Sequence, residues 1–381
     1  MSPDLPDQTQ NVNILRLQVV QADYGDCLVL QYGAEGAAKY ILVDGGPDGV
    51  YANHLRATLE VIASQKGQLD LVVLTHVDED HVVGLVDMLS EMAQARNRGE
   101  AAVIEVGGLW YNTFRPIESG AFGKAGVVEA FSSYLSSAFA GGAMHSAAYS
   151  ITQGEDLWKA AHILKIPLNA NFTDRVVAPE NAPQPVDLDG LKLWVIGPAQ
   201  ANLRRYKRDW DKWFEKHKND PFSPAAAREA DKVDQSVSNL SSIMFLAEVP
   251  GRRMLLTGDG RGGDVMDGLR QAGLCDAEGR LHVDVLKVPH HGSARNNSRE
   301  FYEKITAGKY VIPAGEHGKD GNPDLKTLVW IVESARKRGE QIEMLVTNPN
   351  DNTSELQQRY PAEAYGYSLS SLAPGQHSVV I

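Results

Sequence analysis

The stretch that most constrains the fold is LVVLTHVDEDHVVGL, residues 71–85, in which a continuous apolar run ends in a dense group of polar side chains. His76, Asp78, Asp80 and His81 fall within six residues. A buried carboxylate loses far more hydration free energy than one hydrogen bond returns, so this group requires open solvent or a bound cation. An acidic first helical turn would explain the aspartates, but it gives no reason for two histidines. The pattern therefore predicts metal ligands at the end of a buried strand.

The spacing within this stretch predicts two metal positions. At a strand-to-helix turn, the alternate residues His76 and Asp78 face one ion, while the adjacent Asp80 and His81 face another. Imidazole nitrogen and carboxylate oxygen suit zinc, and each further oxygen ligand moves the preference toward harder ions such as manganese. We therefore expect two divalent metal ions, Zn2+ or Mn2+, as cofactors.

Length and composition limit the class of protein. The 381 residues are 43% hydrophobic and 23% charged, which is typical of globular proteins. No apolar stretch approaches the roughly 18 residues of a membrane span. The net charge of -12 argues against broad adhesion to nucleic acid or anionic membranes, although divalent ions would create a local site for phosphate. The two cysteines do not form a disulfide framework and the polar start is not a secretory signal, so we expect a cytoplasmic location.

Apolar runs and helical periodicities predict one α/β domain. Residues 1–13 are expected to form a disordered tail, and residues 14–381 a single domain with insertions at about 113–185 and 198–240. The domain begins with three short antiparallel strands, and AAVIEV at 101–106 is predicted as a later strand. Both halves repeat the order of strand, polar strand end and helix, which predicts two similar halves packed face to face.

Polar residues follow four of the predicted strands, and open α/β sheets place their ligands at such strand ends. The four ends carry Asp44, the His76 loop, Asp259, and the pair His290–His291. A turn explains the glycines after Asp44, but the aspartate itself also suits a role in orienting a metal-bound histidine or water. Within the first insertion, His145 follows a flexible glycine pair and is a further candidate metal ligand.

A basic and aromatic helix is predicted from Leu203 to Lys218. Its aromatic residues fall on one face and most of its lysines and arginines fall elsewhere. A packed helix with a solvated charged side explains this pattern. A guide for a polyanionic substrate explains it as well, because aromatic side chains offer stacking surfaces.

The motifs DGG, THxDxDH, LLTGD and VPHHGS, in this order and spacing, resemble the metallo-β-lactamase fold superfamily. Within it they are similar to the ComEC-type branch, the nuclease-like domain of a DNA-uptake channel. The resemblance covers roughly residues 14–346 and implies an α/β fold that is a four-layer αβ/βα sandwich. It also implies a ligand set by position: His76 and Asp78 at one metal, Asp80 and His81 at the other, Asp259 as the bridge, and His290 or His291 completing the second site. We predict His290 as the ligand, because it is nearer the strand end, and His291 beside the substrate.

The chain departs from the pattern of the superfamily at three places. Hydrolases of thioesters, lactones and β-lactams mostly have histidine where this chain has Asp78, and their additional mid-chain histidine has no clear counterpart. ComEC-like sequences usually carry Asn followed by His-Pro near the end, whereas here His317 stands upstream of Asn322-Pro323. His317, Lys319 and Asn322 are our candidates for contact with a phosphate oxygen, and Ser293 is a candidate for a supporting or substrate contact.

Together these features predict a metal-dependent phosphodiesterase or nuclease in which two metals activate a hydroxide. The predicted catalytic residues are Asp80, Asp259, His291 and His317. A hydrolase of a small ester, lactone or thioester is the alternative, since the same metal chemistry supports it. A third interpretation is a metal-binding module whose insertions recruit a protein partner. The expected partner is nucleic acid or another phosphodiester, and no membrane.

Overall fold

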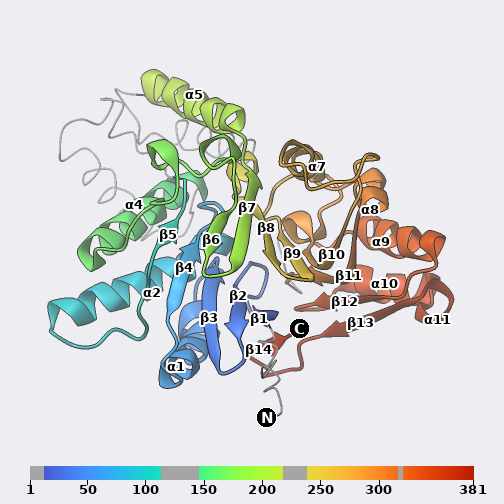
Figure 1. The fold of residues 1–381 in the computed structure, drawn as a ribbon, viewed down its shortest axis with the longest axis horizontal. Coiled ribbons are helices and arrows are strands. Elements are labelled where there is room, and N and C mark those ends of the chain that lie inside the picture. Colours follow the sequence, from blue (N-terminus) through green and yellow to red (C-terminus); the bar gives the residue numbers. More distant parts are fainter. Residues whose placement is uncertain (1–12, 113–145, 218–237, 316–320) are drawn as a thin grey trace, which may run out of the picture.

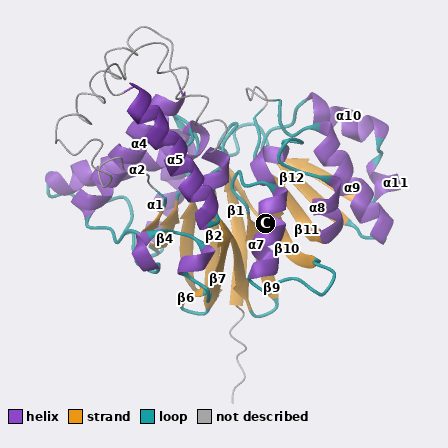
Figure 2. Cartoon of the chain, turned by 90° about the horizontal axis from the view of Figure 1, so that it is seen from above, coloured by secondary structure: helices purple, strands orange, loops and turns teal. Residues whose placement is uncertain are grey.

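The computed structural model describes residues 13–112, 146–217, 238–315 and 321–381, and in these ranges the chain forms two β-sheets that face each other. Helices cover the outer face of each sheet, so the layers follow in the order helices, sheet, sheet, helices (Figure 1 and Figure 2). Three buried apolar clusters fill the three interfaces between these layers. The predicted four-layer αβ/βα sandwich is therefore confirmed.

The first sheet has six strands and contains the predicted amino-terminal meander. In spatial order the strands are β14 (Ser378–Val380), β1 (Asn13–Val20), β2 (Leu28–Ala34), β3 (Ala37–Val43), β4 (Leu69–Val73) and β5 (Leu109–Trp110). The strands β1, β2 and β3 pair antiparallel, whereas β4 and β5 continue the sheet in parallel. At the other edge β14 pairs antiparallel with β1, so the last residues of the chain lie beside the first described strand.

The second sheet has eight strands. In spatial order they are β13 (Tyr367–Ser371), β12 (Ile342–Val346), β11 (Ile305–Ile312), β10 (Leu281–Lys287), β9 (Arg252–Leu256), β8 (Met244–Val249), β7 (Leu191–Gly197) and β6 (Val186–Leu188). The strands from β9 to β13 are parallel, and those from β6 to β9 are antiparallel. The carboxyl ends of the parallel strands consequently meet at one edge of the sheet, where ligands bind in open α/β sheets.

The helices form the two outer layers. On the first sheet these are η1 (Tyr51–Leu55), α1 (Arg56–Ser64), α2 (Glu79–Asn97) and α4 (Ser146–Leu164). On the second sheet they are α7 (Gly262–Gln271), α8 (Arg299–Lys304), α9 (Leu325–Arg338), α10 (Asp351–Arg359) and α11 (Ala362–Tyr365). The helix α5 (Gln200–His217) follows β7 and extends away from the sheets (Figure 1). Short helical turns in the connections are η3 (Thr173–Arg175), η4 (Pro179–Asn181), η5 (Ser238–Ser241) and η6 (Pro289–Gly292).

Consecutive apolar residues explain why the central strands are buried on both faces. In β3, Ile41 and Leu42 point to opposite sides of the sheet, and both are fully buried. Ile41 joins the cluster between the sheets, and Leu42 joins the cluster under α1 and α2. A continuous apolar run is the sequence pattern of a strand that is covered on both faces. Such runs made most of the strands predictable.

The predicted strand at 101–106 is wrong. These residues form no strand, and only Val106 makes an isolated bridge, to Leu69. Regular pairing begins at β5, shortly after Gly107. A Cβ added to Gly107 would lie 2.7 Å from the carbonyl oxygen of Asp70. The close approach that the ladder needs is thus possible at the glycine and not at the larger residues before it.

The insertion predicted at 113–185 lies partly outside the described residues, because its first part up to 145 is not described. From Ser146 on, α4 packs against α2. Its residues Leu157, Ala160 and Ala161 are buried in the same cluster as the core of α2. This part of the predicted insertion therefore belongs to the outer helical layer.

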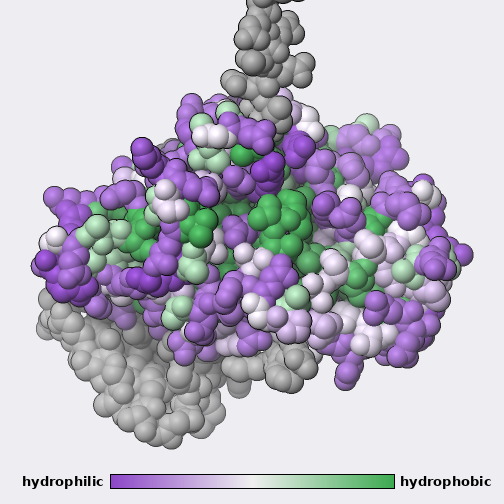
Figure 3. All heavy atoms as spheres, turned by 90° about the horizontal axis from the view of Figure 1, so that it is seen from below, coloured by the Kyte–Doolittle hydropathy of each residue, from purple (hydrophilic) through white to green (hydrophobic). Residues whose placement is uncertain are grey.

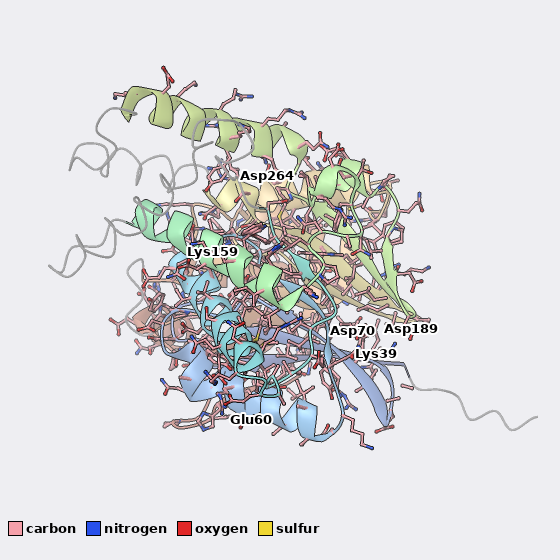
Figure 4. The ribbon with its side chains drawn as sticks, turned by 90° about the vertical axis from the view of Figure 1, so that its left-hand side faces the viewer. Lys39, Glu60, Asp70, Lys159, Asp189 and Asp264 are labelled. Carbon is pink, nitrogen blue, oxygen red and sulfur yellow. The ribbon has the colours of Figure 1, made fainter. Side chains whose placement is uncertain are left out.

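The surface is mostly polar. On the face in Figure 3, hydrophilic side chains surround a group of hydrophobic ones near the middle. Figure 4 labels Lys39 and Asp189, which form an ion pair between the two sheets, from β3 to the turn between β6 and β7. Because Asp189 is 76% exposed, solvent screens this pair and it contributes little to stability. Within the described ranges, no helix has the length and apolar content needed to cross a membrane.

Candidate metal centre

The His76 motif and the pair His290–His291 converge on one carboxylate, that of Asp259. Its Oδ2 lies 3.5 Å from Nε2 of His81 and from Nε2 of His291. The same oxygen lies 3.6 Å from Nε2 of His290 and 3.9 Å from Nε2 of His76. His76 and His81 follow β4 of the first sheet, whereas Asp259, His290 and His291 follow β9 and β10 of the second. The site is therefore assembled from both sheets.

Around Asp259 the other candidate ligands separate into two groups. Asp78 lies by the first histidine of the motif, with its Oδ2 3.4 Å from Nε2 of His76. Asp80 lies by the other pair, with its Oδ2 3.6 Å from Nε2 of His81 and 3.3 Å from Nε2 of His291. One ligand atom from each of Asp80, His81, Asp259 and His291 falls within 4.8 Å of all the others. These four residues make a compact candidate for one metal ion.

The unpaired nitrogens of the site fit a metal. Nε2 of His76, His81 and His291 are buried, and none has a hydrogen-bond partner among the described residues. Leaving a buried polar atom unsatisfied costs roughly 1–3 kcal/mol. Three such atoms aimed at one carboxylate are explained if a cation with a preference for nitrogen and oxygen ligands binds between them. The residues present therefore fit divalent metal ions.

The outer ring nitrogens fix how two histidines are oriented. Nδ1 of His81 lies 2.8 Å from Oδ2 of Asp44, and Nδ1 of His291 lies 2.9 Å from the carbonyl oxygen of Pro313. Both partners are acceptors, so both Nδ1 atoms donate and both Nε2 lone pairs remain free for a metal. Asp44 is itself held, since it accepts hydrogen bonds from the backbone N–H and the hydroxyl of Thr75. The contact with His81 is of the kind that the sequence suggested for Asp44, and the role of Asp44 in orienting a metal-bound histidine stays a prediction.

His290 differs from His291 in its outer contact. Its Nδ1 lies 3.1 Å from Nδ2 of Asn239, an amide nitrogen that donates. His290 then carries its own proton on Nε2, which faces Asp259 as a donor rather than as a metal ligand. His290 is also more open, with a side chain 20% exposed against 5% for His291. The contacts favour His291 as the ligand and His290 beside the substrate, the opposite order to our prediction, and the assignment stays a prediction.

Charge in the site is strongly coupled. Burial alone would lower the pKa of His291, but Asp259 and Asp26 raise that pKa to about 10. Burial would likewise lower the pKa of His81, and Asp80, Asp259 and Asp44 raise it well above its ordinary value. Without metal, the carboxylates therefore hold protons on these imidazoles. Metal binding must displace those protons, so metal affinity rises with pH.

The backbone is strained at the same places. Asp44, His290 and His291 have φ angles of 59°, 47° and 50°, in the left-handed region that non-glycine residues rarely occupy. Such conformations cost about 1–3 kcal/mol each and persist where the surrounding structure enforces them. The surrounding structure therefore fixes the backbone at three residues of the candidate site.

Two buried charged residues at the site were not predicted. Asp26 and Lys287 are each 1% exposed, and Nζ of Lys287 lies 2.6 Å from Oδ2 of Asp26. The sequence signal for Lys287 was its position inside the apolar run VDVLKV, where a charge needs a partner. Asp26 lies in the turn between β1 and β2, and nothing in that turn distinguishes it from a solvated aspartate.

The remaining predicted residues are placed only in part. Ser293 is 7% exposed, and its N–H donates to the carbonyl oxygen of His290, so it supports the histidine loop. Asn322 precedes Pro323. Pro323 packs so closely on Gly292 that a Cβ added to this glycine would lie 2.8 Å from Cβ of Pro323. His145, His317 and Lys319 lie outside the described residues, and their predicted roles stay predictions.

Residues 21–95 match the sequence profile of the metallo-beta-lactamase superfamily. The matched segment contains Asp44 and the whole motif from His76 to His81. The predicted resemblance to the metallo-β-lactamase superfamily is confirmed. The two facing sheets with outer helices are consistent with the fold of this superfamily.

Two proteins give more detail about the likeness. Over 95 residues the chain is 28% identical to ComE operon protein 3 of Bacillus subtilis (strain 168), and the match covers 25% of this chain and 12% of that protein. The chain thus matches only about an eighth of the length of this relative. A crystal structure from Parabacteroides distasonis, of a protein provisionally named a metal-dependent hydrolase, aligns with 87% of this chain and 93% of its own at 10% identity. Its TM-score is 0.36.

Proposed function

We propose that this chain is a metal-dependent hydrolase of phosphodiester bonds, with nucleic acid as its substrate class. The observation that carries the proposal is the convergence of buried, unpaired Nε2 atoms of His76, His81 and His291 around Oδ2 of Asp259. Superfamily membership supports hydrolysis, and the donor set supports a metal as the agent of it.

The charges at the site support two divalent ions. Five carboxylates and one ammonium lie buried or partly buried there: Asp26, Asp44, Asp78, Asp80, Asp259 and Lys287. With neutral histidines they leave four negative charges, which two divalent ions neutralise. Burying these carboxylates without compensating charge would be costly, because each loses its hydration.

The residues divide the work of the site between them. Two bound ions would supply a water of lowered pKa and would polarise a phosphate oxygen. We assign His76, Asp78 and Asp259 to one ion, and Asp80, His81, His291 and the same Asp259 to the other. Asp78, Asp80 and His290 are the partly exposed members, at 28%, 24% and 20% of their side chains, so we expect substrate to approach from their side. His290 would then donate from Nε2 to a nonbridging oxygen.

Two features favour phosphodiesters over small esters, lactones or thioesters. Asp78 adds a carboxylate oxygen where a histidine is common, and this makes the first metal position harder and better suited to a manganese-like ion and to phosphate oxygen. The match to ComE operon protein 3, although short, supports the same direction.

The helix α5 supports a polymeric substrate. Leu203 and Tyr206 are buried, whereas the basic side chains Arg204, Arg205, Lys207, Arg208, Lys212 and Lys216 are exposed, in a protein whose net charge is -12. The helix packs against η5, and Asn239 of η5 contacts His290 at the candidate centre. The basic helix α5 thus packs against a segment that contacts the site, and its positive charges would attract a phosphate backbone there.

The test combines metal analysis with a panel of substrates. The purified protein, stripped and then supplied with Zn2+ or Mn2+, is assayed on DNA, RNA, bis-nitrophenyl phosphate, a lactone and a thioester. We expect phosphodiester cleavage that chelator abolishes and that His76→Ala removes without loss of fold. His162→Ala is the matched control, because His162 is exposed and stacks on Trp158 outside the site. Efficient lactone hydrolysis with inert phosphodiesters would contradict the proposal.

A further inference from the structure

Lys287 is a fully buried lysine at the end of β10, directly behind the candidate metal ligands. Its Nζ lies 2.6 Å from Oδ2 of Asp26, 2.8 Å from the carbonyl oxygen of Gly258 and 3.4 Å from Oδ1 of Asp259. An ammonium group has three donors and no acceptor, so these three oxygens match its hydrogen-bonding capacity. Lysine is almost never fully buried without such partners. The position is therefore built around a positive charge.

The two oxygens of the Asp259 carboxylate have different partners. Oδ1 faces the ammonium, whereas Oδ2 is the atom that lies 3.5 Å from Nε2 of His81 and of His291. A carboxylate held in this way presents one oxygen, rather than two, to the metal positions. The rotation of the Asp259 side chain is thus fixed from behind.

Asp26 extends the same contact to the first sheet, because it lies between β1 and β2 of that sheet. It lies in the turn from β1 to β2, and its backbone N–H donates to the carbonyl oxygen of Asp80. Ligand atoms of Asp26, Asp44 and His81 lie close enough together to hold a cation. Lys287 brings a positive charge to this cluster from β10, at 2.6 Å from Asp26. The ammonium therefore supplies Asp26 with the positive charge that a cation in this cluster would otherwise supply.

We propose that Lys287 is a positioning residue that acts as a fixed monovalent cation inside the metal centre. It neutralises Asp26, and it holds Asp259 so that Oδ2 alone is shared between the two metal positions. The inference rests on the proposed metal-dependent function, but it does not depend on which substrate is cleaved.

The decisive variant is Lys287→Met combined with Asp26→Asn, which removes the cation and the charge of its first partner together. Binding of Zn2+ and Co2+ to the metal-free protein is measured by competition with a chromophoric chelator, by elemental analysis and by the Co2+ absorption spectrum. We expect affinity to fall about 10- to 100-fold, as for other partners of metal ligands. We also expect the Co2+ spectrum to change, because Asp259 becomes free to rotate.

Asp26→Asn alone is the matched control, since it leaves the contact between Lys287 and Asp259 in place. We expect it to retain both metal equivalents and the spectrum of the unsubstituted protein, with a lower affinity because one negative charge of the site is lost. Loss of an equivalent in this variant would identify Asp26 as a ligand and overturn the inference. If the methionine variant does not fold, Lys287→Leu with Asp26→Asn, which also removes both the charge and the donor, is judged by the same outcomes.

The outcomes separate this inference from the proposed function. Unchanged affinity and an unchanged Co2+ spectrum in the double variant would overturn the role of Lys287 and leave the hydrolase proposal intact. Metal binding that depends on Lys287, together with inert phosphodiesters, would support the inference and overturn the proposed substrate. Absence of metal binding by the unsubstituted protein would overturn both.

Discussion

Replacing Asp44 with asparagine should remove one metal ion while preserving the fold. Asp44 is fully buried and accepts from Nδ1 of His81 and from the N–H and hydroxyl of Thr75. An asparagine still accepts the Thr75 N–H through its oxygen, but it then turns an NH2 group toward His81. The histidine must accept at Nδ1, so its proton moves to Nε2 and blocks the lone pair that faces Asp259. Asparagine tolerates the left-handed backbone of this position, so the chain can keep its conformation.

The size of the effect follows from the contact that is lost. A hydrogen bond to a charged group contributes about 1.5–3 kcal/mol. At about 1.4 kcal/mol per factor of ten, this corresponds to a loss of about 10- to 100-fold in metal affinity. The loss should fall on the ion assigned to Asp80, His81 and His291, leaving the other ion bound.

The assay is a titration of the metal-free protein with Zn2+ against a competing chelator, with circular dichroism to monitor the fold. Asp70→Asn is the matched control, because Asp70 accepts from the hydroxyl of Tyr32 and is not among the candidate ligands. We expect the control to bind metal like the unsubstituted protein. A folded Asp44→Asn variant that binds two ions with undiminished affinity would refute the argument from the histidine proton.

Three other outcomes are expected. Asp80→Ala should lose one metal equivalent and keep the other, as counted by elemental analysis, because we assign Asp80 to one ion only; loss of both equivalents would contradict this. Arg204→Glu with Arg208→Glu should slow the cleavage of DNA or RNA about tenfold or more at low salt. Cleavage of bis-nitrophenyl phosphate should stay unchanged, since only a polymer reaches α5. Equal losses on both substrates would indicate a folding role. Burial and the neighbouring His377 lower the pKa of His54, so its charged form is disfavoured in the folded protein, and stability should fall as pH drops below about 6.5. His54→Gln should flatten the decline of the melting temperature between pH 7 and pH 5, and an unchanged decline would count against this cause.

Local apolar pattern accounts for what could be predicted of the fold. Apolar runs predicted the three antiparallel strands β1 to β3 and the buried strand β4 before the His76 motif, since such a pattern reflects burial of the element itself. The segment at 101–106 misled because its apolar residues form no regular ladder: Val106 makes only an isolated bridge, and β5 begins after Gly107 permits close approach. The strand propensity of residues 101–106 does not reveal that close backbone approach is possible only at the glycine.

The residues of the candidate site could likewise be predicted only in part. Histidines and aspartates crowded at strand ends are visible in the sequence, and they led to Asp259 and the His76 motif. The pairing of Lys287 with Asp26 joins two sheets and depends on tertiary contact, so neither residue stood out. The different surroundings of His290 and His291 are likewise set by Asn239 and Pro313, which are distant in sequence. Adjacent residues with the same side chain can therefore take different roles for reasons that only the fold supplies.

Because the candidate ligands come from both sheets, neither half of the chain alone supplies all of the ligands that we assign. His76 and His81 reach Asp259 and His291 only after the two sheets have docked across their shared apolar cluster. A newly made chain should consequently bind metal tightly only late in folding. The bound metal should then stabilise the docked arrangement of the two halves. A chain nicked between the two sheets, or one that has folded halfway, would retain much of its helix and strand content and still be catalytically inert. Hydrolytic activity would thus be withheld until assembly is complete.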